Sequence, residues 1–481
     1  MKEKIASFFK FNERSTNFKS ETLGGVVTFL AMSYILAVNP TMISAAGIPL
    51  GGAFIATALG AFIATIIMAF LANYPVALAP GMGVNAFFTF TIVGGVTATT
   101  SYGIGYTWQE ALAIAFIGGL IFVAISFTSL RTKLITAIPN GLKSAIGAGI
   151  GFFIAFVGLQ NAGVIQANPS TGVALGKLTD PNVLVALFGI ILIFILYNLK
   201  NKKIARFSFI IAILSTGILY TILALFKVPG IEPIQILKYK DLSTFKETFG
   251  GFITGFKTLF QDTPEVHNGS IVVRQTFTKE AKLLTLPIIV FALLFVDIFD
   301  TAGTLVGVTK AAKLEDENGN IPNLDKALFA DAIGTLISAS FGTPEITSYV
   351  ESATGVESGA RTGFANIITG SLFLLSILLY PIMGIFNILP VTSMALVLVG
   401  ALMANQISEI DFSDKVIGLA SFMTILGMVL TYSVADGIAF GFITYSIGMI
   451  AQGNAKKVHP LIYIFSIGFI IYFAIYSIMF I

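Results

Sequence analysis

Two aspartates, Asp297 and Asp300, lie inside the apolar stretch "FVDIFDTAGTLVGVTK" (295–310). No other charged residue occurs between positions 283 and 309. Their spacing of three places both carboxyl groups on one face of a helix. A pair of carboxyl groups in apolar surroundings can exchange a proton or accept hydrogen bonds from a ligand. The alternative is that one of them only caps or bonds a neighbouring helix.

A second acidic cluster, Glu345, Glu351 and Glu357, lies in "GTPEITSYVESATGVESGART" (342–362). A proline and three glycines make a continuous helix unfavourable here, and the β-branched and aromatic run 346–350 predicts a short extended piece. Glu351 falls where this piece gives way to a helix, so we predict that it meets a ligand; an N-cap role is the alternative. Glu345 and Glu357 lie toward the ends of the segment and are predicted at its rim.

The first half of the chain has a matching break in "PVALAPGMGVNAFF" (75–88), which supplies Gly81, Gly83 and Asn85. An amide offers both a donor and an acceptor, which suits a flat ligand with mixed hydrogen-bonding edges. Gly83 and Asn85 are therefore candidate ligand-binding residues.

The composition indicates that these residues are surrounded by lipid. Of 481 residues, 56% are hydrophobic and 11% are charged, whereas soluble domains carry about 25% charged residues. Segments such as 22–44 and 461–481 contain no charged side chain, and each can cross a hydrocarbon layer of about 30 Å as a helix. The chain is thus predicted to be an all-α polytopic membrane protein. An ionised carboxylate at mid-membrane costs about 2.5–3.5 kcal/mol, so acids kept there are candidate functional groups.

Other kinds of chemistry find little support in the sequence. There are no cysteines, which excludes disulfides and thiolate metal sites, and the two histidines, His267 and His459, lie beside polar or charged residues. We therefore expect carboxylates to handle protons, with no metal and no cofactor. The net charge of +3 is too small to indicate a nucleic-acid partner. Segment 1–21 lacks the apolar region of a secretory signal peptide.

Hydropathy predicts a long series of membrane spans. They are placed near 22–44, 51–72, 76–96, 108–130, 134–165, 182–199, 204–226, 283–309, 327–343, 345–360, 362–384, 387–407, 414–433, 436–452 and 459–480. The second half shows one window more than the first, so one window is a half-helix or an added crossing, and we expect about 14 spans.

Basic loops predict the orientation. The segments 131–133 and 200–206 follow the fourth and sixth spans, on the same side as the N-terminus, and the positive-inside rule makes this side cytoplasmic. The longest polar connection, residues 232–280, then lies outside the cell. Within it, "FKETFGGFITGFKTLF" (245–260) is predicted to be an interfacial helix. The predicted organisation is a cytoplasmic N-terminal segment (1–21), a first repeat (22–226), an extracellular connection (227–282) and a second repeat (283–481).

Two pairs of segments indicate an internal repeat. Residues 137–163 resemble 388–409, because both begin with an aliphatic–Pro pair and end with paired amides. Residues 75–88 likewise resemble 345–359, since each joins a short extended stretch to a glycine-bearing break and a helix. An odd number of spans per half inverts the second half, and broken segments at matching positions are the best sequence indication of a transporter's binding site.

Nucleotide-driven transport is not supported. The segment 172–177 is one residue short of a phosphate-binding loop, and 147–151 lacks the preceding strand and final glycine of a dinucleotide fingerprint. An ion gradient is the expected energy source. Two other classes stay open, a membrane-embedded hydrolase that uses paired carboxylates and a channel, although the broken helices favour alternating access.

Several motifs together carry a family resemblance. The chain resembles the adenine/guanine/hypoxanthine permease branch of the nucleobase:cation symporters, in the nucleobase–ascorbate transporter superfamily, over nearly its whole length. The motifs are "TFLAMSYILAVNP" (28–40), "APGMGVNAFF" (79–88), "DIFDTAGTLVGV" (297–308), "ADAIGT" (330–335), "TSYVESATGV" (347–356), "RTGF" (361–364) and "YSVADGIAFGF" (432–442). Ala360 and the pair Pro344–Glu345 depart from the usual family pattern, which could alter substrate preference.

The resemblance implies two inverted seven-span repeats arranged as a core and a gate domain, with a short strand in the third and tenth spans. It implies uptake of purine nucleobases (adenine, guanine and hypoxanthine) across the cell membrane by proton symport and alternating access. Asp300 matches the eighth-span acid that contacts the base, and Glu351 matches its tenth-span counterpart. Both are also implied as proton-coupling residues. Gly83 and Asn85 match the third-span pair, and Asp297 is a second proton-coupling candidate.

Some alternatives remain open at this stage. A symporter of the same fold could carry xanthine, urate or uracil, and the coupled ion could be sodium rather than a proton. An anion carrier would place a Lys or Arg at the site, and neither site segment has one at its centre. The sequence does not decide between a monomer and a homodimer.

Overall fold

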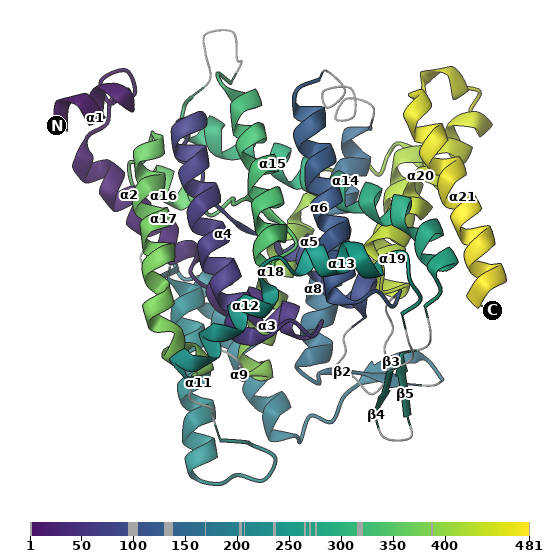
Figure 1. The fold of residues 1–481 in the computed structure, drawn as a ribbon, viewed down its shortest axis with the longest axis horizontal. Coiled ribbons are helices and arrows are strands. Elements are labelled where there is room, and N and C mark those ends of the chain that lie inside the picture. The colour runs from purple at the N-terminus through teal and green to yellow at the C-terminus, as the bar shows by residue number, and fades with distance from the viewer. Residues whose placement is uncertain are drawn as a thin grey trace.

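The computed structural model describes residues 2–94, 104–128, 138–168, 170–201, 204–205, 207–233, 237–263, 266–268, 271–274, 277–314, 321–385 and 388–480. Only the backbone is described at 210, 266–268, 271–274, 299–300, 302–303, 306–307, 310–311, 383, 385, 472 and 475–480. Eight of the described helical segments are long and apolar enough to cross a membrane, and five shorter apolar helices accompany them. The chain is a multi-pass membrane protein, as its composition predicts (Figure 1).

The first half is a series of apolar helices interrupted by one strand. Its elements are α1 (Lys2–Phe8), α2 (Phe18–Met32), α3 (Ile35–Ser44), α4 (Leu50–Leu71), β1 (Leu78–Pro80), α5 (Met82–Ala86), the π-helix η1 (Phe87–Val93), α6 (Trp108–Ser126), α8 (Asn140–Asn161), β2 (Ile165–Asn168), β3 (Gly172–Leu175), α9 (Pro181–Tyr197) and α11 (Ser208–Leu225).

The connection and the second half follow a similar plan, with a strand again ahead of a short helix. The connection holds η2 (Tyr239–Thr244), α12 (Phe245–Thr248), α13 (Gly251–Thr258), β4 (Val266–Asn268) and β5 (Ile271–Arg274). The second half holds α14 (Lys279–Ala311), α15 (Leu324–Phe341), β6 (Ile346–Ser348), α16 (Ser352–Glu357), α17 (Gly363–Leu375), η3 (Ser376–Ile385), α18 (Leu389–Ala404), η4 (Asn405–Glu409), α19 (Lys415–Leu430), α20 (Val434–Ala451), η5 (Ala455–Lys457) and α21 (Pro460–Phe480).

Polar caps define where several of these helices begin. The side chains of Asn17, Thr107, Asp180, Asp414 and Ser433 each accept a hydrogen bond from a backbone N–H in the first turn of the helix that follows. Thr107 forms a full capping box with the glutamate three residues later. Because the first N–H groups of a helix have no partner within the helix, these caps fix the ends that sequence periodicity alone leaves vague.

The helices form two groups, here named the core group and the gate group. In the core group α4 packs against α3, α15 and α17, α2 against α16 and α17, and α6 against α14, α15 and η1, while α5 contacts α14. In the gate group α8 packs against α18 and α19, α9 against α11 and α18, and α19 against α20. Each group thus combines helices from both halves of the chain, which agrees with the inverted-repeat fold that the sequence predicts.

In both pairs of similar segments found in the sequence, the two members contact each other in the structure. The segment that contains α8 resembles the one that contains α18, and these two helices pack together in the gate group. The two segments around the predicted breaks form β1 and β6, which pair with each other in the core group. The last hydrophobic window of the second half forms a helix, α21, which packs on α20.

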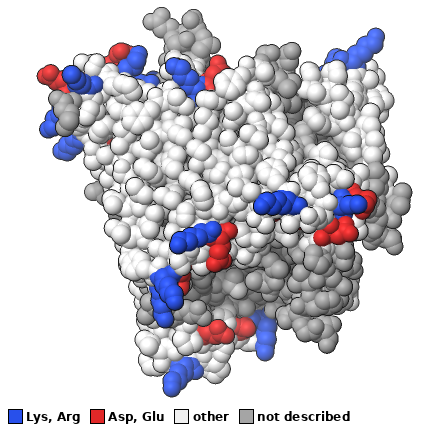
Figure 2. All heavy atoms as spheres, in the orientation of Figure 1, with Lys and Arg blue, Asp and Glu red and all other residues white. Residues whose placement is uncertain are grey.

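On the face drawn in Figure 2, charged side chains lie along the upper edge and over the lower part, and a band without charge separates them. The N-terminus lies toward one end of the molecule, and the hairpins β2–β3 and β4–β5 lie toward the other in this view (Figure 1). Many large apolar side chains are exposed on the described helices, among them Leu184, Ile191, Ile218 and Phe422. An uncharged, apolar belt is the surface that a bilayer requires.

The connection differs in one respect from the prediction. The expected single interfacial helix over 245–260 is two short helices, α12 and α13, because Gly250 adopts a left-handed backbone (φ 72°) between them. Three large apolar side chains there stay exposed, Phe249, Ile253 and Phe260.

Candidate functional site

Two short strands from opposite halves of the chain meet in the core group. β1 and β6 are antiparallel, with Leu78 opposite Ser348 and Pro80 opposite Ile346, and every residue of both strands is buried. The phenol of Tyr349 extends the contact, since its hydroxyl donates to the Pro80 carbonyl at 2.6 Å. Extended backbone at membrane depth must have its polar groups paired, and this ladder pairs them within the protein. The predicted short strands are therefore confirmed.

Glu351 follows β6 and precedes α16. It occupies the N-cap position, yet its side chain caps nothing and is half-buried. Its Oε1 instead accepts a hydrogen bond of 2.8 Å from the Tyr34 hydroxyl, which lies in the short break between α2 and α3. The N-cap alternative raised from the sequence is therefore wrong, and the carboxylate is directed across the core group. The Tyr34 ring stacks on Phe209 at 4.4 Å, with an interplanar angle of 12°.

The acidic helix α14 lies beside these strands. It contacts α5, β6 and α16, so the helix that bears Asp297 and Asp300 borders both broken segments. Asp297 is 2% exposed, and its Oδ2 accepts a hydrogen bond from Thr335 at 3.1 Å. The side chain of Asp300 lies outside the described part of the structure, which places only its backbone, in α14. The role given to Asp300 stays a prediction.

Another buried acid belongs to this region, and the sequence analysis did not assign it a role. Asp331 of α15 is 0% exposed and accepts hydrogen bonds from Thr301 at 2.8 Å and Ser348 at 3.1 Å. The Thr301 hydroxyl also lies 2.8 Å from that of Thr347 in β6. One carboxylate thus joins α14, α15 and β6. The motif "ADAIGT" contained this residue, but no spacing rule pointed to its partners.

Asn85 lies on the first-half break, fully buried. Its Nδ2 donates to Asn39 Oδ1 at 2.7 Å, and Asn39 in turn donates to Thr57 and Thr343. Its Oδ1 has no hydrogen-bond partner in the described part of the chain. A buried amide oxygen without a partner is costly, so it is the atom of this side chain that a ligand N–H or a water would satisfy.

Gly83 lies at a close contact between α5 and α8 of the gate group. A Cβ added at this position would lie 2.8 Å from Cγ2 of Ile150 in α8, closer than side chains tolerate. Glycine therefore lets α5 approach α8. Nothing in the described structure tests whether Gly83 touches a ligand, and that role stays a prediction.

Of the two glutamates predicted at the rim of the second acidic cluster, one is exposed and the other is buried. Glu357 is exposed at the end of α16, but Glu345 is 2% exposed, and its backbone carbonyl accepts a bond of 3.4 Å from Gly81 N–H. Glu345 is buried because the Gly81–Glu345 bond extends the β1–β6 pairing by one residue, to the position just before β6. Sequence position within the window could not reveal this closure.

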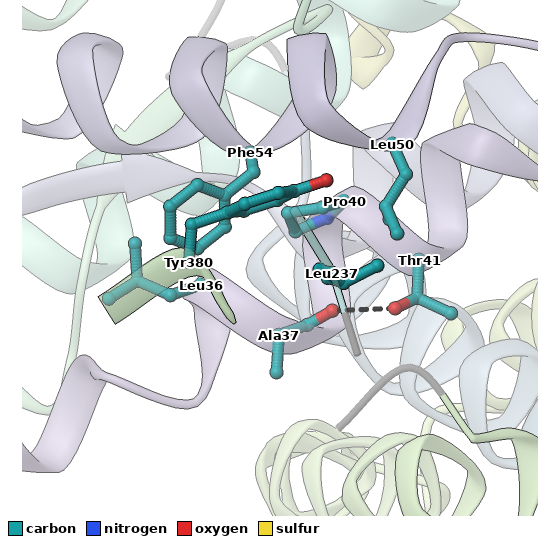
Figure 3. A pocket seen from close by; sticks show the side chains of 8 residues that line it. All are labelled: Leu36, Ala37, Pro40, Thr41, Leu50, Phe54, Leu237 and Tyr380. Atoms are coloured by element: carbon teal, nitrogen blue, oxygen red, sulfur yellow. Dashed lines mark hydrogen bonds between the residues drawn. The ribbon is translucent and has the colours of Figure 1, made fainter. Parts of the chain in front are cut away.

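The cavities of the described part differ greatly in size. A void of about 10 Å³ beneath Tyr380, between α3, α4 and the connection, is lined by Leu36, Phe54 and Leu237, and the Thr41 hydroxyl turns away to the Ala37 carbonyl at 2.8 Å (Figure 3). It is too small and too apolar for a ligand with hydrogen-bonding edges. A much larger cavity, of about 870 Å³, lies between the core and gate groups.

Known proteins resemble this chain over almost its whole length. It is 41% identical to the guanine/hypoxanthine permease PbuG of Bacillus subtilis, with 98% of this chain and 99% of that protein covered. It is 36% identical to the guanine/hypoxanthine permease PbuO of the same organism, over 96% of this chain and 99% of that one. For the adenine permease AdeP of Escherichia coli the identity is 33%, over 96% of this chain and 94% of that one.

Solved structures resemble the fold. The transmembrane domain of a cyanobacterial bicarbonate transporter, BicA, superposes with a TM-score of 0.57 at 18% identity, covering 88% of this chain and 97% of that one. SLC26A9 gives a TM-score of 0.54 at 12% identity, covering 89% and 65%. Both are transporters built on the inverted-repeat fold. Residues 19–440 match the sequence model of the Permease family, so the chain belongs to this family of nucleobase–ascorbate transporters, which are permeases and not enzymes.

Proposed function

We propose that this protein takes up purine nucleobases (adenine, guanine and hypoxanthine) across the cell membrane by proton symport. The observation that carries the proposal is the position of Glu351, whose carboxylate caps no helix and faces inward from the β1–β6 junction beside α14. Relatives that match along their whole length are named guanine/hypoxanthine and adenine permeases.

Each site residue has a role in this proposal. Asp300 and Glu351 accept hydrogen bonds from the ring N–H groups of a neutral purine, because carboxylates are acceptors. Asn85 offers its unpaired Oδ1, and Gly83 keeps the backbone close to the base. Asp297 is a further group for the proton. No Lys or Arg occurs in β1, α5, β6 or α16, which favours a neutral ligand with N–H donors over an anion.

The proton sets the order of events. Protonation from outside removes the charge penalty of the buried acids, permits the purine to bind and lets the core group move past the gate group. Deprotonation on the inner side releases the base. Because the proton and the purine change each other's affinity, the coupling is a linkage between two sites. The N-terminus is cytoplasmic in this scheme, since the basic loops lie on its side.

The test is uptake of labelled hypoxanthine in cells that lack their own purine uptake. Asp300→Ala and Glu351→Ala are expected to abolish uptake while surface expression persists. The matched control is Glu357→Ala, which removes an exposed acid from the other end of α16 and is expected to keep uptake. Undiminished uptake in both site variants would refute the scheme.

Substrate choice and the coupled ion are tested together. Competition by unlabelled adenine, guanine, xanthine, urate and uracil at two external pH values ranks the substrates. Proton symport predicts faster uptake at the lower external pH and loss of accumulation with a protonophore. Uptake that depends on external sodium and does not respond to the protonophore would show that the coupled ion is sodium and not a proton.

A further inference from the structure

The large cavity between the two groups has its own set of lining residues. It measures about 870 Å³, within the range of about 300–1,000 Å³ typical of small-molecule sites. Neither Glu351, Gly83, Asn85 nor Asp297 lines it. The lining is shared by the core group and the gate group, and this cavity is named the vestibule. Its lining comes from α3, η1, α8, the β2–β3 hairpin, α18 and the end of α19, and includes Phe90, Phe156, Gln160, Asn161 and Tyr432.

An aromatic cluster forms one wall of the vestibule. Tyr432 makes edge-to-face contacts with Phe153 at 5.3 Å, and with Phe90 and Phe156 at 6.2 Å each. Phe90, Phe156 and Tyr432 border the cavity, so their rings are available to a flat ligand. Stacking of a nucleobase on an aromatic side chain contributes about 1–3 kcal/mol and tolerates any base.

The backbone at Tyr432 is held in an unusual conformation. Its φ is 56°, in the left-handed region that an aromatic residue rarely adopts, and the Thr91 hydroxyl donates to its carbonyl at 3.0 Å. This bond joins η1 of the core group to the end of α19 in the gate group. Residues kept in such conformations cluster at ligand-binding and moving parts of proteins.

The polar side chains of the vestibule are of two kinds. The hydroxyls of Thr41, Thr392 and Thr431 donate to carbonyls one turn earlier in their own helices. By contrast, the side-chain amides of Gln160 and Asn161 at the end of α8 are half-buried, and they make no hydrogen bond within the part of the chain that the structure describes. Two adjacent amides with open donors and acceptors match the mixed edge of a neutral nucleobase.

We propose that the vestibule is a second purine site, in which the base stacks on Tyr432 and Phe156 while Gln160 and Asn161 bind its edge. This inference rests on the proposed function. Phe90 lies five residues beyond Asn85, in η1, which follows α5 directly, so the two residues are at most about 8 Å apart along the axis at the α-helical rise per residue. A base in the vestibule therefore waits next to the central site, on the hairpin side, which is extracellular in the proposed orientation.

The first test counts binding sites. Purified protein in detergent is titrated with labelled hypoxanthine by equilibrium dialysis. The wild type is expected to bind two molecules per chain, and Glu351→Ala to retain only the vestibule molecule. Gln160→Leu combined with Asn161→Leu is expected to retain only the central one, whose survival shows that the variant is folded. A single site in the wild type, lost in Glu351→Ala and kept in the amide variant, would overturn the proposal.

The second test uses transport. Loss of the two amides removes hydrogen bonds worth about tenfold in affinity, so the KM for hypoxanthine uptake is expected to rise about tenfold, with the maximal rate less affected. The matched control is Asn405→Leu, which alters the echoed amide pair of the second half at an exposed position outside the vestibule and should leave KM unchanged. An unchanged KM in the amide variant refutes the vestibule site alone. No hypoxanthine uptake by the wild type refutes the proposed function instead.

Discussion

The ion pair between Lys282 and Glu110 gives the sharpest test of how this fold is held together. Both side chains are 1% exposed, and their charged atoms lie 2.7 Å apart. The three donors of the Lys282 ammonium match three acceptors, since it also bonds the carbonyls of Thr258 at 3.3 Å and Gln261 at 2.6 Å. Glu110 in turn completes the capping box of α6. The pair joins α6, α13 and α14 at one end of the core group.

Removing one partner leaves a buried charge without compensation. Glu110→Leu or Lys282→Met is expected to lower the free energy of unfolding by about 3–5 kcal/mol. At about 2.1 cal/mol/K per residue, unfolding this chain has an entropy near 1 kcal/mol/K, so each variant should lower Tm by roughly 3–5 °C. The double variant, with apolar side chains at both positions, should recover most of the loss, because replacing a whole buried pair is often neutral.

The assay is thermal unfolding of purified protein in detergent, followed by intrinsic fluorescence. The exposed pair Lys10–Glu13, whose side chains are 54% and 66% exposed, is the control. Breaking it with Glu13→Gln should change stability by less than about 1 kcal/mol. The reasoning fails if either buried single variant matches this control, or if the double variant is less stable than both single variants.

Three further predictions concern the site. Gly83→Ala should reduce purine uptake severalfold because its Cβ meets Ile150, and Gly83→Ala with Ile150→Ala should restore part of it, as measured by initial rates at equal surface expression. Asp331→Ala leaves two buried hydroxyl donors without their acceptor, at a cost of about 1–3 kcal/mol each, so its Tm should be lower than that of the wild type. Asp331→Asn keeps an acceptor oxygen, so its Tm should be lowered less. Tyr34→Phe deletes the donor to Glu351 and should change how uptake depends on external pH while preserving the fold; an unaltered pH profile would show that this bond has no part in coupling.

The sequence predicted the elements of the site better than its contacts. The strand before Glu351 followed from β-branched residues next to a glycine-bearing break, and the repeat was visible as two pairs of similar segments. These features are local, so periodicity and turn chemistry can detect them. The Tyr34–Glu351 bond joins residues 317 positions apart, and the Asp331 network joins three elements, so no spacing rule could find either. The break at Gly250 inside the predicted interfacial helix was missed because the apolar periodicity continues across it.

The chemistry of the contacts indicates which parts move. Within the core group, buried polar bonds tie separate elements together, as Asn366 does by donating to the carbonyls of Tyr74 and Val76. Buried polar bonds between elements favour one geometry, because a displacement would leave the bonded groups without partners. This group is therefore expected to move as one body.

The boundary with the gate group is different. Phe291 of α14 stacks on Phe465 of α21 at 3.8 Å, and Phe295 meets Phe442 of α20 at 5.4 Å. Apolar surfaces can slide past one another by small shear steps without breaking directional bonds. The bond from Thr91 to the Tyr432 carbonyl does cross this boundary, at the wall of the vestibule. If the core group slides, this bond breaks. Tyr432, on which we place the base in the vestibule, therefore changes its contacts when the two groups move.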